Sequence, residues 1–165
     1  MTATRYDRRM HTLMNDRRAA PMYATAARRR FAVGAHIALT AAGFATAVFW
    51  PGFWGGIAIL VLLLPWAVAT GTINAATRGL LELRGRMLDE RQLVERDRVR
   101  SLAHTVTTWV LLAGALAVAA ASRLTDAHLA DHVAPLLFAA VALHWLMPLW
   151  VAGLRAEDEP ADDEL

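Results

Sequence analysis

Residues 54–76 read WGGIAILVLLLPWAVATGTINAA, a run of 23 residues without one charged side chain. A helix needs about 20 predominantly apolar residues to cross the hydrocarbon core of a bilayer, which is about 30 Å thick. This run therefore predicts a transmembrane helix.

Further apolar stretches of similar length lie on both sides of this run. The chain has 165 residues, 56% of them hydrophobic, with a mean hydropathy of +0.33, and its charges collect between the apolar stretches. This uneven distribution predicts an all-α, polytopic membrane protein with four transmembrane helices in residues 31–154. The expected spans are residues 31–50, 54–76, 101–121 and 133–154.

The arginines predict the orientation in the membrane. Eight Arg precede the first span and seven lie in the segment 77–100, whereas the two loops on the other side carry only Arg123. Basic residues of short loops stay on the cytoplasmic side. We therefore expect a multi-pass protein of the plasma (inner) membrane whose basic arm (1–30), segment 77–100 and tail (155–165) are cytoplasmic. The tail is strongly acidic, and we expect it to be disordered.

The segment 77–100 is expected to form a long cytoplasmic helical region with one interruption, near residues 85–89. Asp89 followed three positions later by Gln92 has the pattern of a capping box, in which two side chains satisfy the first backbone groups of a helix. This pattern predicts a helix that begins at about Glu90 and continues into the third span.

The same region carries the one resemblance in the chain. The stretch LDERQ at 88–92, followed by RDR at 96–98 and an Ala-containing span, resembles small prokaryotic multi-pass membrane proteins with a cytoplasmic Asp-Glu-Arg-(Glu/Gln) motif before a span. The resemblance covers about residues 87–121. It implies an ordered cytoplasmic feature that contacts a partner, and no catalytic role comes with it.

Three polar side chains are expected at similar depth on three helices. His36, Asn74 and His104 lie six, four and four residues from the nearest flanking arginine, or about 6–9 Å inside the boundary at 1.5 Å per residue. Polar groups inside a membrane usually face other helices. The hypothesis is a shared polar layer, either a hydrogen-bonded layer that holds helices together or a cluster that binds a proton or ligand.

His144 is expected deeper, about 16 Å from the boundary that Arg155 marks. The alternatives for it are a hydrogen bond between helices and a role in a small transporter or channel-like subunit. A third alternative is a redox subunit that holds haem b between imidazoles of His36, His104 or His144.

Small residues recur at every fourth position in three spans, which lets helices approach closely. We expect these rows to pack within one chain, with a homo-oligomer as the alternative. The rows are Gly34, Ala38, Ala42 and Thr46; Ala67, Gly71 and Ala75; and Ala113, Ala117 and Ala121.

Catalytic and metal-binding signatures are absent from the sequence. The chain contains no cysteine, and it contains no HExxH, GxSxG or glycine-rich phosphate-binding motif. We therefore expect no catalytic residue, metal or cofactor. The arginines flank the apolar stretches and act as topology signals, so the basic composition does not indicate nucleic acid, and no nucleic-acid partner is expected. The expected function is an accessory, scaffolding or regulatory role through the cytoplasmic Arg-rich segments. The expected partners are anionic lipid headgroups and either a second copy or a larger membrane complex.

Overall fold

The computed structural model describes residues 4–15, 20–124 and 133–156, which form helices and turns and contain no strand. The acidic tail from residue 157 onward and residues 125–132 of the loop before the last span lie outside the described residues. The elements in chain order are α1 (Arg5–Met14), α2 (Ala20–Tyr23), α3 (Ala26–Phe49), α4 (Phe53–Ala76), the 3-10 helix η2 (Gly85–Met87), α5 (Glu90–Leu124) and α6 (Val133–Arg155).

Four of these helices, α3, α4, α5 and α6, are long and apolar enough to cross a membrane. The shortest has 23 residues, which at about 1.5 Å per residue exceeds the roughly 30 Å of the hydrocarbon core. The prediction of an all-helical chain with four helices long and apolar enough to cross a membrane is thus confirmed. The helices extend beyond the apolar stretches, because Thr25 caps α3 ahead of its arginines and α5 begins well before residue 101.

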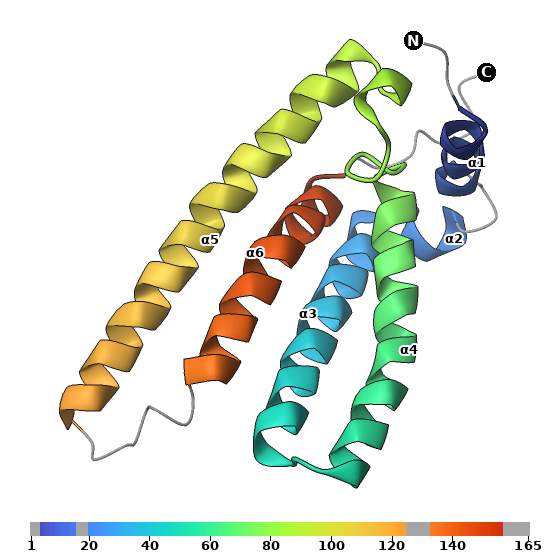
Figure 1. Ribbon diagram of the computed structural model, residues 1–165. Coiled ribbons are helices and arrows are strands. Elements are labelled where there is room, and N and C mark those ends of the chain that lie inside the picture. Colours follow the sequence, from blue (N-terminus) through green and yellow to red (C-terminus); the bar gives the residue numbers. More distant parts are fainter. Residues whose placement is uncertain (1–3, 16–19, 125–132, 157–165) are drawn as a thin grey trace.

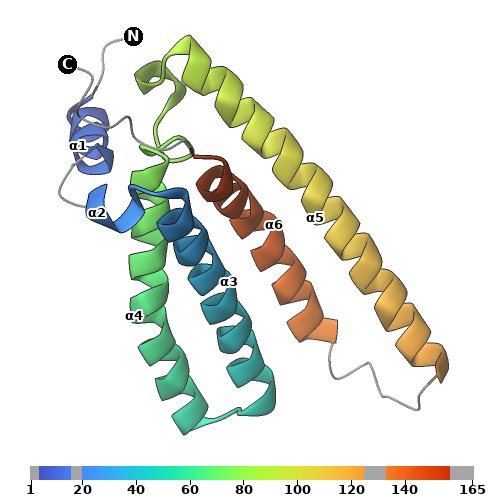
Figure 2. The ribbon, with the colours of Figure 1, turned by 180° about the vertical axis from the view of Figure 1, so that it is seen from behind.

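The four long helices lie side by side in the order α5, α6, α3 and α4 (Figures 1 and 2). α3 and α4 form an antiparallel hairpin, α6 packs against both, and α5 packs chiefly against α6. We call the end where α3 and α5 begin and α4 and α6 end the basic end. The pair α5 and α6 diverges from α3 and α4 toward the opposite end (Figure 1).

The core lies in the half of the helices nearest the basic end. Apart from Gly55, the buried residues of the four long helices all fall in that half. Val33, Ile73 and Val99, each at most 2% exposed, come from three different helices and belong to one cluster with Trp150 of α6. The opposite half presents apolar side chains outward, as a lipid-facing surface requires.

The rows of small residues lie largely outside this core. Gly34, Ala38, Ala67 and Gly71 are exposed, as are Ala113 and Ala117. The expectation that these rows pack within one chain is therefore wrong for most of their members. The core instead uses other small residues of the same helices, such as Ala103 and Ala152.

The connection between α4 and α5 is only partly helical. Arg78 and Gly79 have positive φ values of 51° and 70°, which end α4, and turns follow up to the short η2. The predicted cap of α5 is confirmed, because the Asp89 N–H donates to Gln92 Oε1 at 3.0 Å and the Gln92 N–H to Asp89 Oδ1 at 2.7 Å. The helix begins at Glu90 as predicted, but residues 78–84 do not extend the helical region that we expected there.

Candidate functional site: the intramembrane histidines

His36 is fully buried where α3, α4 and α6 meet. Its Nε2 lies 3.0 Å from the Thr70 hydroxyl of α4, and its Nδ1 accepts a hydrogen bond of 2.9 Å from the indole N–H of Trp150 in α6. One imidazole therefore links three helices through side chains that are 34 and 114 positions away in the sequence.

These partners determine the tautomer of His36. An indole N–H only donates, so Nδ1 must carry a lone pair, and the proton of the neutral ring resides on Nε2. Nε2 then donates to Thr70, whose hydroxyl in turn donates to the carbonyl oxygen of Trp66 at 2.9 Å. Both ring nitrogens are occupied, and the imidazole is neutral.

Trp66 completes the cluster from α4. Its ring lies 4.6 Å from the His36 ring, centroid to centroid, and its N–H donates to the Thr40 hydroxyl at 3.0 Å. Thr40 donates in turn to the carbonyl oxygen of His36 at 2.8 Å. We call these residues, with Thr70 and Trp150, the His36 network. Every donor in it meets an acceptor, so the network joins helices and leaves no side-chain N–H or O–H group of its own free for a ligand.

His104 and His144 lie elsewhere, on the two helices α5 and α6. Both side chains are exposed, and both line one partly open cavity of about 190 Å³, which we call the α5–α6 cavity. An ion pair of 2.9 Å between Arg155 Nε and Glu95 Oε1 joins the two antiparallel helices nearer the basic end. The cavity is lined by Arg100, Ala103, His104, Thr107, His144 and Pro148.

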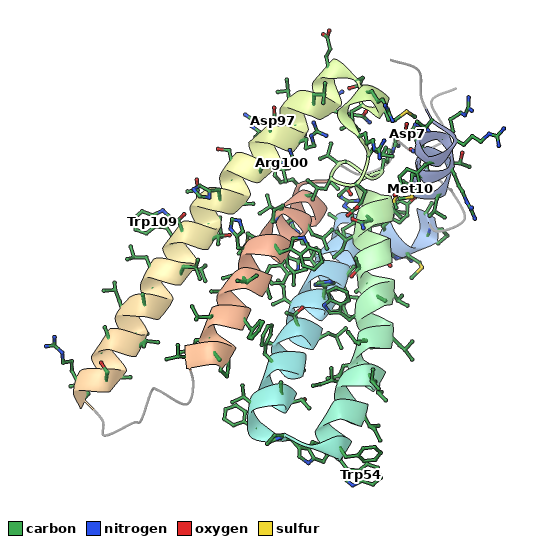
Figure 3. All side chains as sticks on the ribbon, viewed as in Figure 1. Asp7, Met10, Trp54, Asp97, Arg100 and Trp109 are labelled. Carbon is green, nitrogen blue, oxygen red and sulfur yellow. The ribbon has the colours of Figure 1, made fainter. Side chains whose placement is uncertain are left out.

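The structure does not bring His36, Asn74 and His104 together as the hypothesis of a shared polar layer requires. Among the described residues, no hydrogen bond joins any two of them, and Asn74 Oδ1 has no partner at all. The depth of His104 was counted from Arg100 as the boundary. The Glu95–Arg155 ion pair shows that α5 already runs beside the end of α6 five residues before Arg100, so Arg100 does not mark where α5 meets the other helices. Figure 3 shows Arg100 on the side of α5 that faces α6, whereas Trp109 points away from the other helices.

A buried carboxylate outside the spans was missed by the sequence analysis. Asp7 of α1 is 2% exposed, and it accepts hydrogen bonds from the Thr4 hydroxyl at 2.7 Å, the Thr4 N–H at 2.8 Å and Arg86 at 2.5 Å. Arg84 Nε lies 3.7 Å from its other oxygen. The hydrogen bonds from Thr4, followed by that from Arg86, lower the pKa of Asp7 from 3.8 to about 2, against the opposing effect of burial.

The position of Asp7 ties the N-terminal arm to the α4–α5 connection. Arg86 belongs to η2, 79 positions farther along the chain, and the Arg84 guanidinium also lies 5.8 Å from the Tyr6 ring centre. The Thr4–Asp7 spacing is that of a capping box, which was the available sequence signal for α1. The pairing with Arg84 and Arg86 had no such signal.

The described residues hold no group of three His, Asp or Glu side chains placed to bind a metal ion. No family model, curated protein or solved structure matches the chain. The resemblance of residues 87–121 to prokaryotic membrane proteins with an Asp-Glu-Arg-(Glu/Gln) motif accordingly stays a prediction.

Proposed function

We propose that the protein is an accessory or regulatory subunit of the plasma (inner) membrane that engages a partner through an ordered, arginine-bearing layer at its basic end. The arginine asymmetry of the sequence supports a cytoplasmic position for this end and for both termini. Reporter fusions at Leu88 and Ala127 test the orientation. The first should report the cytoplasm and the second the outside.

The observation that carries the proposal is the contact of Asp7 with Arg84 and Arg86. It holds α1 against the α4–α5 connection, with Asp7 inward and Arg5, Arg8 and Arg9 exposed. Exposed guanidinium groups on an ordered helix suit acidic surfaces, including acidic protein segments and anionic lipid headgroups. A cationic surface held in place on an ordered helix supports a binding role.

Photo-crosslinking in living cells tests this function. A photoreactive residue at position 8 should give a discrete protein adduct, whereas the same residue at position 123, an exposed arginine near the opposite end of α5, should not. Equal adducts from both positions, or none from position 8, would argue against a partner at the basic end. If position 8 crosslinks to lipid and to no protein, the partner of the basic end is limited to lipid headgroups.

A small transporter or channel-like subunit is the second candidate, and the α5–α6 cavity favours it because His104 and His144 lie there together. Flux through liposomes that contain the purified protein tests this function. Haem b receives less support, since both nitrogens of His36 are engaged and the cavity of about 190 Å³ is smaller than the roughly 300–1,000 Å³ of ordinary ligand pockets. A Soret band in the absorption spectrum of the purified protein would show that it binds haem.

A further inference from the structure

Thr107 differs from the other helical threonines in how it uses its hydroxyl group. Eight other threonines of the described chain donate to the carbonyl oxygen four residues earlier, including its neighbour Thr108. Thr107 is 3% exposed, and its hydroxyl has no hydrogen-bond partner in the described part of the chain. It lines the α5–α6 cavity. Buried hydroxyls are normally satisfied, so this one indicates a polar occupant of the cavity.

The remaining walls of the cavity supply mostly hydrogen-bond donors. Arg100 brings a permanent positive charge and a planar set of N–H groups, and His104 and His144 each bring at least one ring N–H. Pro148 has no N–H, so the carbonyl oxygen of His144, four residues earlier, lacks its usual helical donor. The Arg100 guanidinium only donates, whereas the Thr107 hydroxyl and a neutral imidazole can each donate and accept.

The volume of the cavity and its position in the protein further limit which group can occupy it. A cavity of about 190 Å³ has room for about six water molecules at roughly 30 Å³ each, and so for a small group but not a large cofactor. Arg100 is exposed and follows Glu95 by five residues toward the apolar part of α5, where a positive charge is favoured by an anionic partner. The guanidinium repels cations, so the fitting occupant is an anion.

We propose that the α5–α6 cavity binds one phosphate group, held by Arg100, His104, His144 and the Thr107 hydroxyl. The planar N–H groups of the Arg100 guanidinium match two phosphate oxygens, and the Thr107 hydroxyl and the two imidazoles form hydrogen bonds with the remaining oxygens. A singly protonated phosphate also donates to the freed carbonyl oxygen of His144, which an ionised carboxylate does not do. The group comes either from free phosphate or from a monoester headgroup such as that of phosphatidic acid. The inference is independent of the role proposed for the basic end.

The test is the thermal unfolding of the purified 165-residue chain, followed by the fluorescence of its six tryptophans. One arm titrates inorganic phosphate into protein in a neutral detergent, with sodium chloride adjusted to keep the ionic strength constant. The other arm compares nanodiscs of phosphatidylcholine with and without phosphatidic acid. A probe present at about a hundredfold its dissociation constant should raise Tm by about 5–10 °C.

Paired variants separate binding at the cavity from general salt effects. Thr107→Val removes the hydroxyl at nearly constant shape, and it should lower the affinity for the probe about tenfold. Thr108→Val should leave that affinity unchanged. Thr107→Ser should restore binding. Arg100→Gln should abolish the Tm shift, whereas Arg98→Gln, at an arginine of the same helix that is also exposed but does not line the cavity, should leave it unchanged.

The two arms also identify the source of the group. A shift with inorganic phosphate assigns the site to the free ion, and a shift only with phosphatidic acid assigns it to the lipid. No shift in either arm overturns the proposal. Equal shifts in Thr107→Val and Thr108→Val, or in Arg100→Gln and Arg98→Gln, also overturn it, because they would locate the effect outside the cavity.

Discussion

Gly153 of α6 lies directly against side chains of α3 and α4, and Gly153→Ala should disturb all three helices. A Cβ atom at this position would lie 2.8 Å from Cγ2 of Val33 in α3 and 2.8 Å from Cγ2 of Ile73 in α4. Both neighbours are buried, with 2% and 1% of their surfaces exposed. Both are β-branched and have few χ1 rotamers, so they cannot easily turn away from a new methyl group.

The magnitude follows from these distances. Carbon atoms pack best at about 3.5–4.0 Å, so each neighbour must retreat by about 0.7–1.2 Å. Overpacking of this kind costs about 1–3 kcal/mol, while replacing Gly by Ala inside a helix gains about 0.8–1.0 kcal/mol. The matched control is Gly34→Ala in α3, where a new Cβ meets nothing within 4 Å and only the gain applies. The two variants should therefore differ by about 1–3 kcal/mol.

Thermal unfolding in detergent, followed by tryptophan fluorescence, measures this difference. For a chain of this size it corresponds to a Tm about 2–12 °C lower for Gly153→Ala than for Gly34→Ala. Equal Tm values for the two variants would refute the reasoning, because they would show that α6 does not contact Val33 and Ile73 through Gly153.

Two further predictions concern His36 and Asp7. His36→Ala and Trp150→Phe should be non-additive in unfolding free energy by about 0.5–3 kcal/mol, because the two side chains share a hydrogen bond. His36→Ala and His104→Ala should add within about 0.5 kcal/mol. The reverse pattern in double-mutant cycles would support the shared polar layer instead. The folded pKa of Asp7 is about 2, below its ordinary 3.8, so its contribution to α1 docking should be complete above about pH 5 and lost as the pH falls through about 2. The protection of the α1 amides from hydrogen exchange, relative to the intrinsic rate at each pH, should show this loss in the native protein. The same protection should not depend on pH in Asp7→Asn.

The architecture could be predicted from the sequence because it depends on length and local chemistry. A run such as residues 54–76 is long enough to cross a bilayer as a helix and too apolar for water, whatever its neighbours are. The start of α5 was predictable for a similar reason, since Asp89 and Gln92 satisfy backbone groups within a single turn. Neither inference needed a distant contact.

The partners of the polar residues were decided only by the tertiary structure. Sequence position estimates how deep His36 or His104 lies, but not which way it faces, because the lipid and the protein core are both apolar and the spans carry no amphipathic stripe that marks the buried side. The bond from Trp150 to His36 joins residues 114 positions apart, and that from Arg86 to Asp7 joins residues 79 apart. The register of α5 against α6 separated His104 from His36 and placed it beside His144. Which polar residues meet is therefore set by helix packing. A largely apolar helix can be rotated about its axis in many ways without a change in its sequence pattern, so the sequence does not select one rotation.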